Sequence, residues 1–140
     1  MHNELATLRE KLQTGGYTCV VCLKTEEYCS FERGVKPLLS LLQEKGDGCG
    51  LMAADKTVGA GAAHLYVLLG VRAVWANVIS ESALRILKEN GIEVAYGELV
   101  PYIINRKGDG VCPIEKAVEN AKSSQEAYSF IVDALKKLQK

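Results

Sequence analysis

The chain has 140 residues, and its 17 Lys and Arg residues balance its 17 Asp and Glu residues, so its formal net charge at pH 7 is zero. The length fits one domain with a substantial core, and the 48% hydrophobic and 24% charged content is that of an ordinary globular protein. The balanced charge argues against a dedicated nucleic-acid-binding protein, and no apolar run reaches the roughly 20 residues that cross a bilayer. The opening residues lack the apolar stretch of a signal peptide, so we expect a cytoplasmic protein whose five cysteines are reduced.

The elements are predicted in chain order from hydrophobic spacing and from turn residues. Leu5, Leu8 and Leu12 recur at helical spacing and predict an amphipathic first helix. A polar turn between two apolar runs then predicts a hairpin, after which helices and strands alternate. Ser80 is expected to cap a helix that ends before Gly91. The expected helices cover residues 3–14, 37–45, 58–69, 81–90, 114–122 and 125–137, and the expected strands cover residues 17–23, 28–31, 51–55, 71–79 and 92–95.

This order predicts a single domain over residues 1–140, a three-layer α/β/α sandwich with a mixed, largely parallel five-stranded sheet. The core is expected over about residues 5–97. After Glu98 the periodicity is lost. Because long ordered loops in a compact domain often act as lids, we expect residues 98–140 to cover a pocket.

The most informative stretch, LMAADKTVGAGA at residues 51–62, predicts a buried strand that leads into a glycine-rich helix start. Free backbone N–H groups and the positive end of the helix dipole would then face a cleft. Asp55 and Lys56 are placed at the turn, where side chains commonly contact ligands in α/β sheets. A solvated turn with a capping aspartate is the alternative. Gly59 and Gly61 either pack the helix against the sheet or let the backbone approach a ligand.

Further candidates flank this stretch. Ser30 and Arg33 stand at the end of the second strand and at the next helix start. There, either Arg33 or Lys36 contacts a phosphate, or both are merely solvated. Asn105 suits an amide or hydroxyl partner, and Arg106 a carboxylate or phosphate.

Cys112 precedes a predicted helix, a position that favours reactive thiolates. The alternative is a buried cysteine before a first-turn proline, with Glu115 as a favourable early acid.

The other cysteines and His64 are predicted to be structural. Cys19 and Cys22 are three apart in a strand and face opposite sides, so neither a shared metal nor a disulfide fits. Cys29 and Cys49 have no nearby partner in the sequence. His64 stands among small apolar residues, and it is expected to be a structural helix residue whose ring forms its hydrogen bonds within the protein.

Over about residues 5–97 the order of elements resembles the cytidine deaminase-like fold. LMAADKTVGAGA stands where those enzymes have a strand and a Pro-Cys-x-x-Cys helix start, and VRAVWANV and ENGIEVAYGEL resemble their next two strands. The whole chain is more similar still to a bacterial branch of that superfamily that is a domain of unknown function. The matching pieces are RGVKPLL from residue 33, DKTVG from residue 55, SESA from residue 80 and NRKGDGVCPIE from residue 105.

The resemblance implies a fold and a pocket, and it gives Ser80 a role in that pocket. It does not imply zinc chemistry. Hydrolytic deamination needs Zn²⁺ held by one His or Cys and two further Cys, with a Glu that moves protons. The two corresponding helix starts read RGVK and DKTVG, so these ligands are missing, and Lys56 places a positive charge near the metal position. We therefore expect no metal and no cofactor.

Three functions remain open from the sequence. The first is a zinc-free protein that binds a nucleotide-like or other phosphorylated small molecule, with Lys56 available for a transferase-like reaction. The second is a thiol enzyme or redox sensor centred on Cys112. The third is a non-catalytic homo-oligomeric scaffold with a subunit contact at helix 58–69. The first assigns the ligand to Asp55, Lys56, Ser80, Asn105 and Arg106, with Ser30, Arg33, Gly59 and Glu115 as further candidate ligand-binding residues.

Overall fold

The structure is a computed structural model that describes residues 3–32, 34–104 and 107–138. Within these ranges, none of the helices combines the length and the hydropathy needed to cross a membrane. The elements in chain order are α1 (Asn3–Gly15), β1 (Cys19–Leu23), β2 (Glu27–Ser30), α2 (Lys36–Lys45), β3 (Gly50–Val58), α3 (Ala60–Leu69), β4 (Ala73–Ser80), α4 (Glu81–Glu89), β5 (Glu93–Val100), α5 (Pro113–Ala117) and α6 (Ser124–Leu138).

The strands form one five-stranded sheet in the order β2-β1-β3-β4-β5. β1 is antiparallel to both β2 and β3, whereas β3, β4 and β5 run parallel to one another. The predicted α/β class, the mixed five-stranded sheet and its initial hairpin are therefore confirmed.

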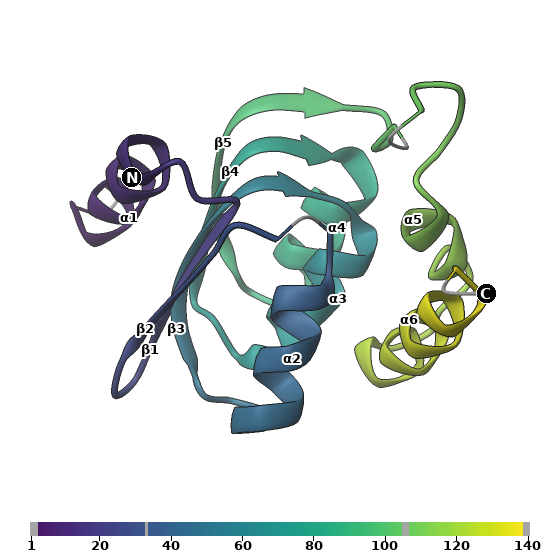
Figure 1. Ribbon diagram of the computed structural model, residues 1–140, viewed down its shortest axis with the longest axis horizontal. Helices are drawn as coiled ribbons and strands as arrows, with labels where there is room; N and C mark the ends of the chain where they lie inside the picture. Colours follow the sequence, from purple (N-terminus) through teal and green to yellow (C-terminus); the bar gives the residue numbers. More distant parts are fainter. Residues whose placement is uncertain (1–2, 33, 105–106, 139–140) are drawn as a thin grey trace.

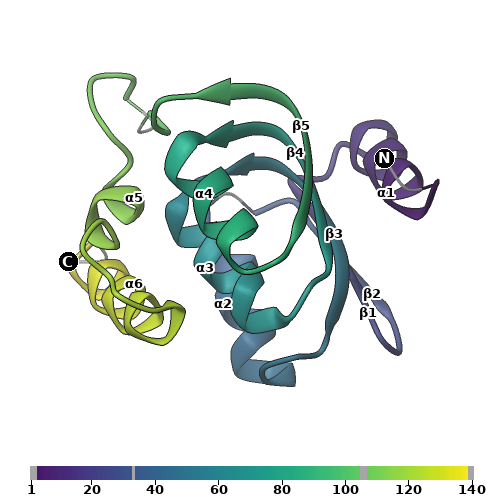
Figure 2. The same ribbon diagram turned by 180° about the vertical axis from the view of Figure 1, so that it is seen from behind.

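Helices cover both faces of the sheet. Figure 1 shows α1 on one face, α2, α3 and α4 on the other, and α5 with α6 outside the helix layer; Figure 2 shows the same order from behind. The predicted apolar stripe of α1 is confirmed, because Leu5, Leu8 and Leu12 are buried against Trp75. The C-terminal helices add a partial fourth layer to the expected three.

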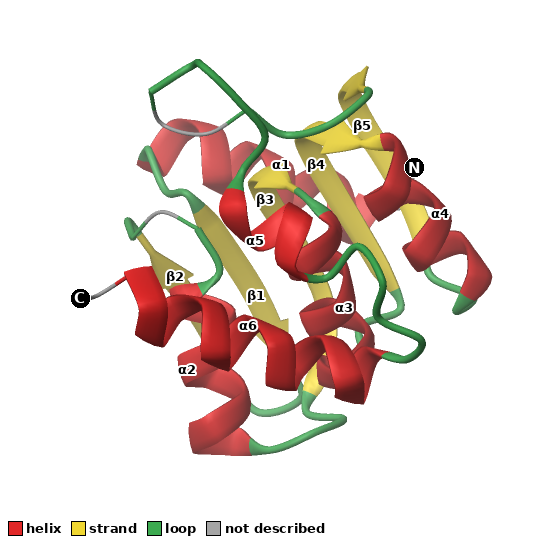
Figure 3. Cartoon of the chain, turned by 90° about the vertical axis from the view of Figure 1, so that its right-hand side faces the viewer, coloured by secondary structure: helices red, strands yellow, loops and turns green. Residues whose placement is uncertain are grey.

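α3 is the central helix of the fold. Every residue from Ala60 to Tyr66 is buried, and α3 contacts β3, α2, α4, α5 and α6. Figure 3 shows α5 and α6 in front of it. Its small residues therefore pack inside the molecule, which corrects the expectation that this helix makes a subunit contact. A homo-oligomer would have to use another surface.

Two strands extend beyond their predicted ends. β3 continues to Val58, which pairs in parallel with Ile79 of β4. The polar side chains of Lys56 and Thr57 hid this extension, because polar residues at a strand end also fit a turn. β5 continues to Val100. It is an edge strand with one neighbour, so its outer side chains are exposed and no apolar pattern marks it.

Candidate functional site

An irregular segment joins β5 to α6. We call its residues 107–123 the strap; turns and bends surround the short helix α5. The predicted helix 114–122 is wrong beyond Ala117. Asn120 favours a turn over helix continuation, and the Ser123 hydroxyl accepts a hydrogen bond from the Glu126 N–H and so begins α6 anew.

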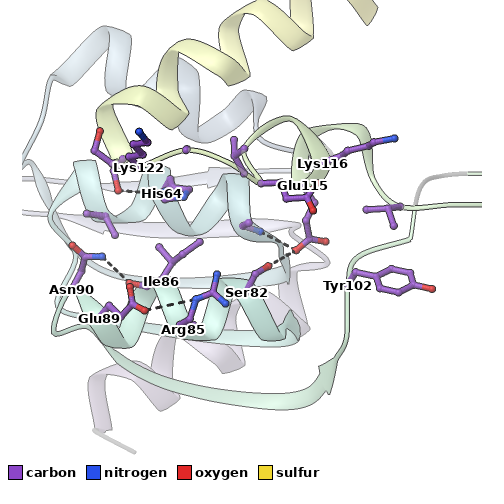
Figure 4. Close-up of a pocket in the computed structure, with 18 of the residues that line it drawn as sticks. His64, Ser82, Arg85, Ile86, Glu89, Asn90, Tyr102, Glu115, Lys116 and Lys122 are labelled. Atoms are coloured by element: carbon purple, nitrogen blue, oxygen red, sulfur yellow. Dashed lines mark hydrogen bonds and ion pairs between the residues drawn. The ribbon is translucent and has the colours of Figure 1, made fainter.

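A groove with a volume of about 1280 Å³ lies between α4 and the strap, with α3 as its floor (Figure 4). Small-molecule pockets in proteins commonly have volumes of about 300–1,000 Å³, so the groove can hold a metabolite. Its polar lining comes from the helices α3, α4, α5 and α6 and from the irregular chain after β5. The principal polar side chains are His64, Arg85, Glu89, Tyr102, Lys116, Glu119 and Lys122.

Basic side chains stand on both walls of this groove. On α4, Arg85 Nε lies 3.7 Å from Glu89 Oε1, and both side chains are about two-thirds exposed. Such a surface pair contributes little stability, so a ligand can replace it. On the strap, Lys116 and Lys122 are exposed, and neither forms an ion pair with another residue that the structure describes. Their ammonium groups can meet an anion in the groove.

His64 lies on the groove floor, where its Nδ1 is 3.0 Å from the Ser124 hydroxyl oxygen of α6. Burial lowers the pKa of His64, so the imidazole is neutral near pH 7. The prediction that His64 is a helix residue with a hydrogen-bond partner inside the protein is confirmed. Its ring also borders the groove.

Glu115 ties the strap to the two helix starts. It is 8% exposed, and its Oε1 accepts hydrogen bonds from the Ala60 N–H and from the Ser82 hydroxyl, each at 3.2 Å. Its Oε2 accepts a hydrogen bond from the Ile103 N–H. A negative charge is favoured at the start of α3 by the helix dipole. Glu115 was predicted to bind a ligand, and in the structure it binds the chain's own donors.

The two glycines at the start of α3 make room for the C-terminal segment. A Cβ at Gly61 would lie 2.5 Å from Cγ2 of Ile114, and a Cβ at Gly59 would lie 3.1 Å from Cγ1 of Ile103. Gly59 caps α3 with an extended backbone that any residue can adopt. Of the two predicted roles for these glycines, the contacts therefore favour packing.

Asp55 belongs to a separate, buried cluster. Its Oδ2 accepts a 2.6 Å hydrogen bond from the Tyr66 hydroxyl, and its Oδ1 accepts one of 3.2 Å from the Thr57 N–H. Burial raises the pKa of Asp55 to about 7, although the hydrogen bonds from Tyr66 and the backbone act in the opposite direction. The Cys19 sulfur lies 3.5 Å from the same hydroxyl. Asp55 is therefore an interior strand residue, which corrects its predicted place at a turn.

Lys56 also lies within β3, and it points away from Asp55 because neighbouring strand residues face opposite sides. It is exposed on the face where Ala54 packs with α1. The predicted Asp55–Lys56 pair is thus separated by the sheet. Ser30 lies on the Asp55 side, since it pairs with Cys19, which in turn pairs with Asp55. Its hydroxyl accepts a 3.0 Å hydrogen bond from the Glu32 N–H.

The remaining candidates are Ser80, Cys112 and three residues outside the described ranges. The Ser80 hydroxyl oxygen lies 3.3 Å from that of Ser82, so Ser80 adjoins the Glu115 cluster. Ser80 caps α4, with its hydroxyl accepting a 3.2 Å hydrogen bond from the Ala83 N–H, so the capping prediction is confirmed. Cys112 is half-buried before α5, and its sulfur has no hydrogen bond among the described residues, so its reactivity stays a prediction. The structure does not describe Arg33, Asn105 and Arg106.

Comparison with known proteins places the chain in a family. Residues 7–135 match TM1506, a domain of unknown function (DUF1893). The chain belongs to the DUF1893 family. The crystal structure of the DUF1893 family protein TM1506 from Thermotoga maritima matches 98% of this chain and 92% of its own, with a TM-score of 0.81 and 23% identity. That similarity shows the fold. No curated protein matches the chain.

The residues at the helix starts of this DUF1893 protein do not fit a deaminase-type zinc ion. α3 begins with Gly59 and Ala60, whose side chains cannot bind a metal. The carboxylate that reaches this helix start is that of Glu115 from the strap. Among the described residues, no three His, Cys, Asp or Glu side chains are grouped as metal ligands.

Sequence reasoning missed the partners that hold these clusters together. Tyr66 is a lone polar aromatic residue in the apolar helix α3, and that is a signal for a buried hydroxyl with a partner. The position of Ser82 in the sequence indicated only an ordinary residue in the first turn of a helix, although its hydroxyl donates a hydrogen bond to Glu115. Ile114, next to a proline, gave no local signal of its contact with Gly61.

The other cysteine predictions agree with the structure. Cys19 is buried on the face of the sheet that α2, α3 and α4 cover, and Cys22 packs on the opposite face, in the cluster that contains α1. The two thiols therefore face opposite sides, as predicted from their spacing. All five cysteines are free.

Proposed function

We propose that the protein binds a small phosphorylated molecule, nucleotide-like in character, in the groove between α4 and the strap. The observation that carries the proposal is the pair of exposed lysines, Lys116 and Lys122, which line one groove of about 1280 Å³. Arg85 lines the same groove from α4. Its guanidinium group can bind two oxygens of one phosphate, a geometry that an ammonium group does not offer.

The other lining residues suit the rest of a nucleotide. The Tyr102 ring is 48% exposed beside the groove and offers a flat surface on which a base can stack. Glu119 lines the strap side, where its carboxylate can accept hydrogen bonds from sugar hydroxyls or base amino groups. This mixture of charges favours a nucleotide over free inorganic phosphate.

The sequence resemblance is a second support. A zinc-free member of the cytidine deaminase-like superfamily would keep a site for a nucleotide-like molecule without the hydrolytic metal. The mixed sheet with its initial hairpin is compatible with that relationship. The proposed function therefore includes membership of the cytidine deaminase-like superfamily.

Isothermal titration calorimetry tests the proposal with five probes: AMP, GMP, CMP, UMP and inorganic phosphate. We expect at least one nucleotide to bind the wild type more tightly than phosphate does. The double variant Lys116→Ala/Lys122→Ala should weaken that binding by at least about tenfold, the loss expected for one charge-assisted hydrogen bond. The matched control is Lys88→Ala/Lys137→Ala, which removes two exposed lysines outside the groove and should bind as the wild type does.

Two results would contradict the proposal. The first is the absence of binding heat for all five probes at millimolar concentration. The second is a nucleotide affinity that the double groove variant leaves unchanged.

A further inference from the structure

The two walls of the groove are tied to each other. Glu115 belongs to the strap, and its Oε1 accepts a hydrogen bond from the Ser82 hydroxyl in the first turn of α4. Figure 4 shows this bond between the two labelled side chains, with His64 on one side of it and Tyr102 on the other. The same oxygen accepts the Ala60 N–H at the start of α3. One carboxylate thus joins the floor and both walls.

We infer that Glu115 is a latch that holds the strap shut, and that its release opens the groove for the entry and exit of ligand. The inference rests on the proposed function for what enters the groove. The latch itself, however, can be measured without any ligand.

The contacts of the strap support a local opening. Besides Glu115, the strap is joined to the preceding chain by the pairing of Ile104 with Val111 and by the Cys112 N–H, which donates to the Ile103 carbonyl oxygen. These contacts lie within the C-terminal segment and do not join the strap to α3 or α4. The bonds of Glu115 to Ala60 and Ser82 do, together with the buried side chains of Ile114 and Val118. Loss of the Glu115 bonds leaves this part of the strap attached to the helix layer by apolar packing alone, which weakens the attachment.

Apolar packing beside Glu115 fixes where the strap lies on α3. Ile114 is buried, and its Cγ2 fills the space that a side chain at Gly61 would need. Lys116, the residue after Glu115, lines the groove. Movement of Glu115 away from α3 therefore moves a groove-lining lysine with it, which couples the latch to the width of the binding site.

Hydrogen–deuterium exchange of the whole chain, read by mass spectrometry, tests the latch. Glu115→Gln keeps the size of the side chain but removes the charge that three donors share. We expect amides of the strap to exchange about ten- to a hundredfold faster than in the wild type, the range for a lost charged hydrogen bond. Amides of β3 and β4 should be unchanged. Glu98→Gln, at an exposed position of β5 outside the groove, is the control and should exchange as the wild type does.

Two outcomes would overturn the latch. In one, the strap of Glu115→Gln exchanges at the wild-type rate. In the other, exchange rises equally in the strap and in β3 and β4, so that Glu115 supports the whole fold and not the strap. Ser82→Ala is the second test, because it keeps the carboxylate and its two backbone donors; it should loosen the strap by a smaller factor, and wild-type exchange in this variant would also contradict the latch.

These results are independent of the binding experiment. A strap that loosens in Glu115→Gln while no nucleotide binds the wild type would remove the proposed function and keep the latch. Nucleotide binding with an unaffected strap would remove the latch alone.

Discussion

The Tyr66 hydroxyl donates a 2.6 Å hydrogen bond to Oδ2 of Asp55 in the interior between α3 and β3. Burial and the neighbouring carboxylate raise the pKa of Tyr66 well above its usual value, so the hydroxyl keeps its proton and remains a donor. Neither residue lines the groove. We therefore expect changes in this pair to alter the stability of the protein and its pH dependence, and not the binding of a ligand in the groove.

Asp55 should make the protein less stable as the pH rises. Its pKa is raised from 3.8 to about 7, so between these values the folded protein holds a proton that the unfolded chain has lost. The contribution of Asp55 to the free energy of unfolding is then largest below about pH 4 and is lost as the pH rises through 7. Asp55→Asn, which stays neutral, should remove a fall on the order of 2–3 kcal/mol between pH 5 and 8, measured by urea unfolding.

Asp133→Asn is the control for this experiment, because Asp133 is exposed on α6. It should leave the wild-type pH profile unchanged. Parallel profiles for the wild type and Asp55→Asn would show that Asp55 is not protonated in the folded protein at pH 5.

Tyr66→Phe should destabilise the protein more at pH 8 than at pH 6. The variant removes the side-chain hydrogen bond that the Asp55 carboxyl accepts from Tyr66, and an ionised carboxylate loses more than a neutral one when such a bond is lost. We expect a loss of about 1–3 kcal/mol in the free energy of unfolding at pH 8. Tyr96→Phe, at an exposed position of β5, should change it little. Equal losses from Tyr66→Phe at both pH values would argue against a titrating partner.

Gly61→Ala should destabilise the protein, although alanine is the better helix former. The new Cβ would lie 2.5 Å from Cγ2 of Ile114, so strap or helix must shift. Overpacking of this kind costs about 1–3 kcal/mol. The measurement is urea unfolding of Gly61→Ala, Ile114→Ala and the double variant. The double variant should be more stable than the sum of the single losses predicts; simple additivity would mean that the two residues do not touch.

Lys56→Ala should leave nucleotide binding unchanged, because Lys56 lies on the opposite face of the sheet from the helices that border the groove. Lys122→Ala should weaken binding, since Lys122 lines the groove. Calorimetric titrations of the two variants with the nucleotide that binds best compare them directly. A larger loss from Lys56→Ala would restore the site predicted at the end of β3 and displace the groove.

Local patterns in the sequence were enough for most elements of the fold. The leucine spacing in α1, the paired apolar runs of the hairpin and the serine cap of α4 each reflect a structure formed by neighbouring residues. The ends of β3 and β5 were missed because their pairing partners lie on another strand. Polar residues such as Lys56 are compatible with either a turn or an exposed strand end.

The site depended on contacts between distant parts of the chain, and these leave no local pattern. Glu115 bonds Ala60, which lies 55 residues earlier, and Ser82, which lies 33 residues earlier. The sequence indicated an acid at the start of α5, but not that it would serve the starts of α3 and α4. Likewise, the row of paired residues Ser30, Cys19 and Asp55 follows from strand register, which a single sequence does not specify.

Native mass spectrometry shows whether the groove holds a small molecule. The wild type, purified without denaturation and incubated with the four nucleoside monophosphates, is weighed in the native and the denatured state. We expect a native mass excess equal to one nucleotide, lost on denaturation and absent from Lys116→Ala/Lys122→Ala. A native mass equal to that of the bare chain, or an excess that the double variant retains, would contradict the proposed binding.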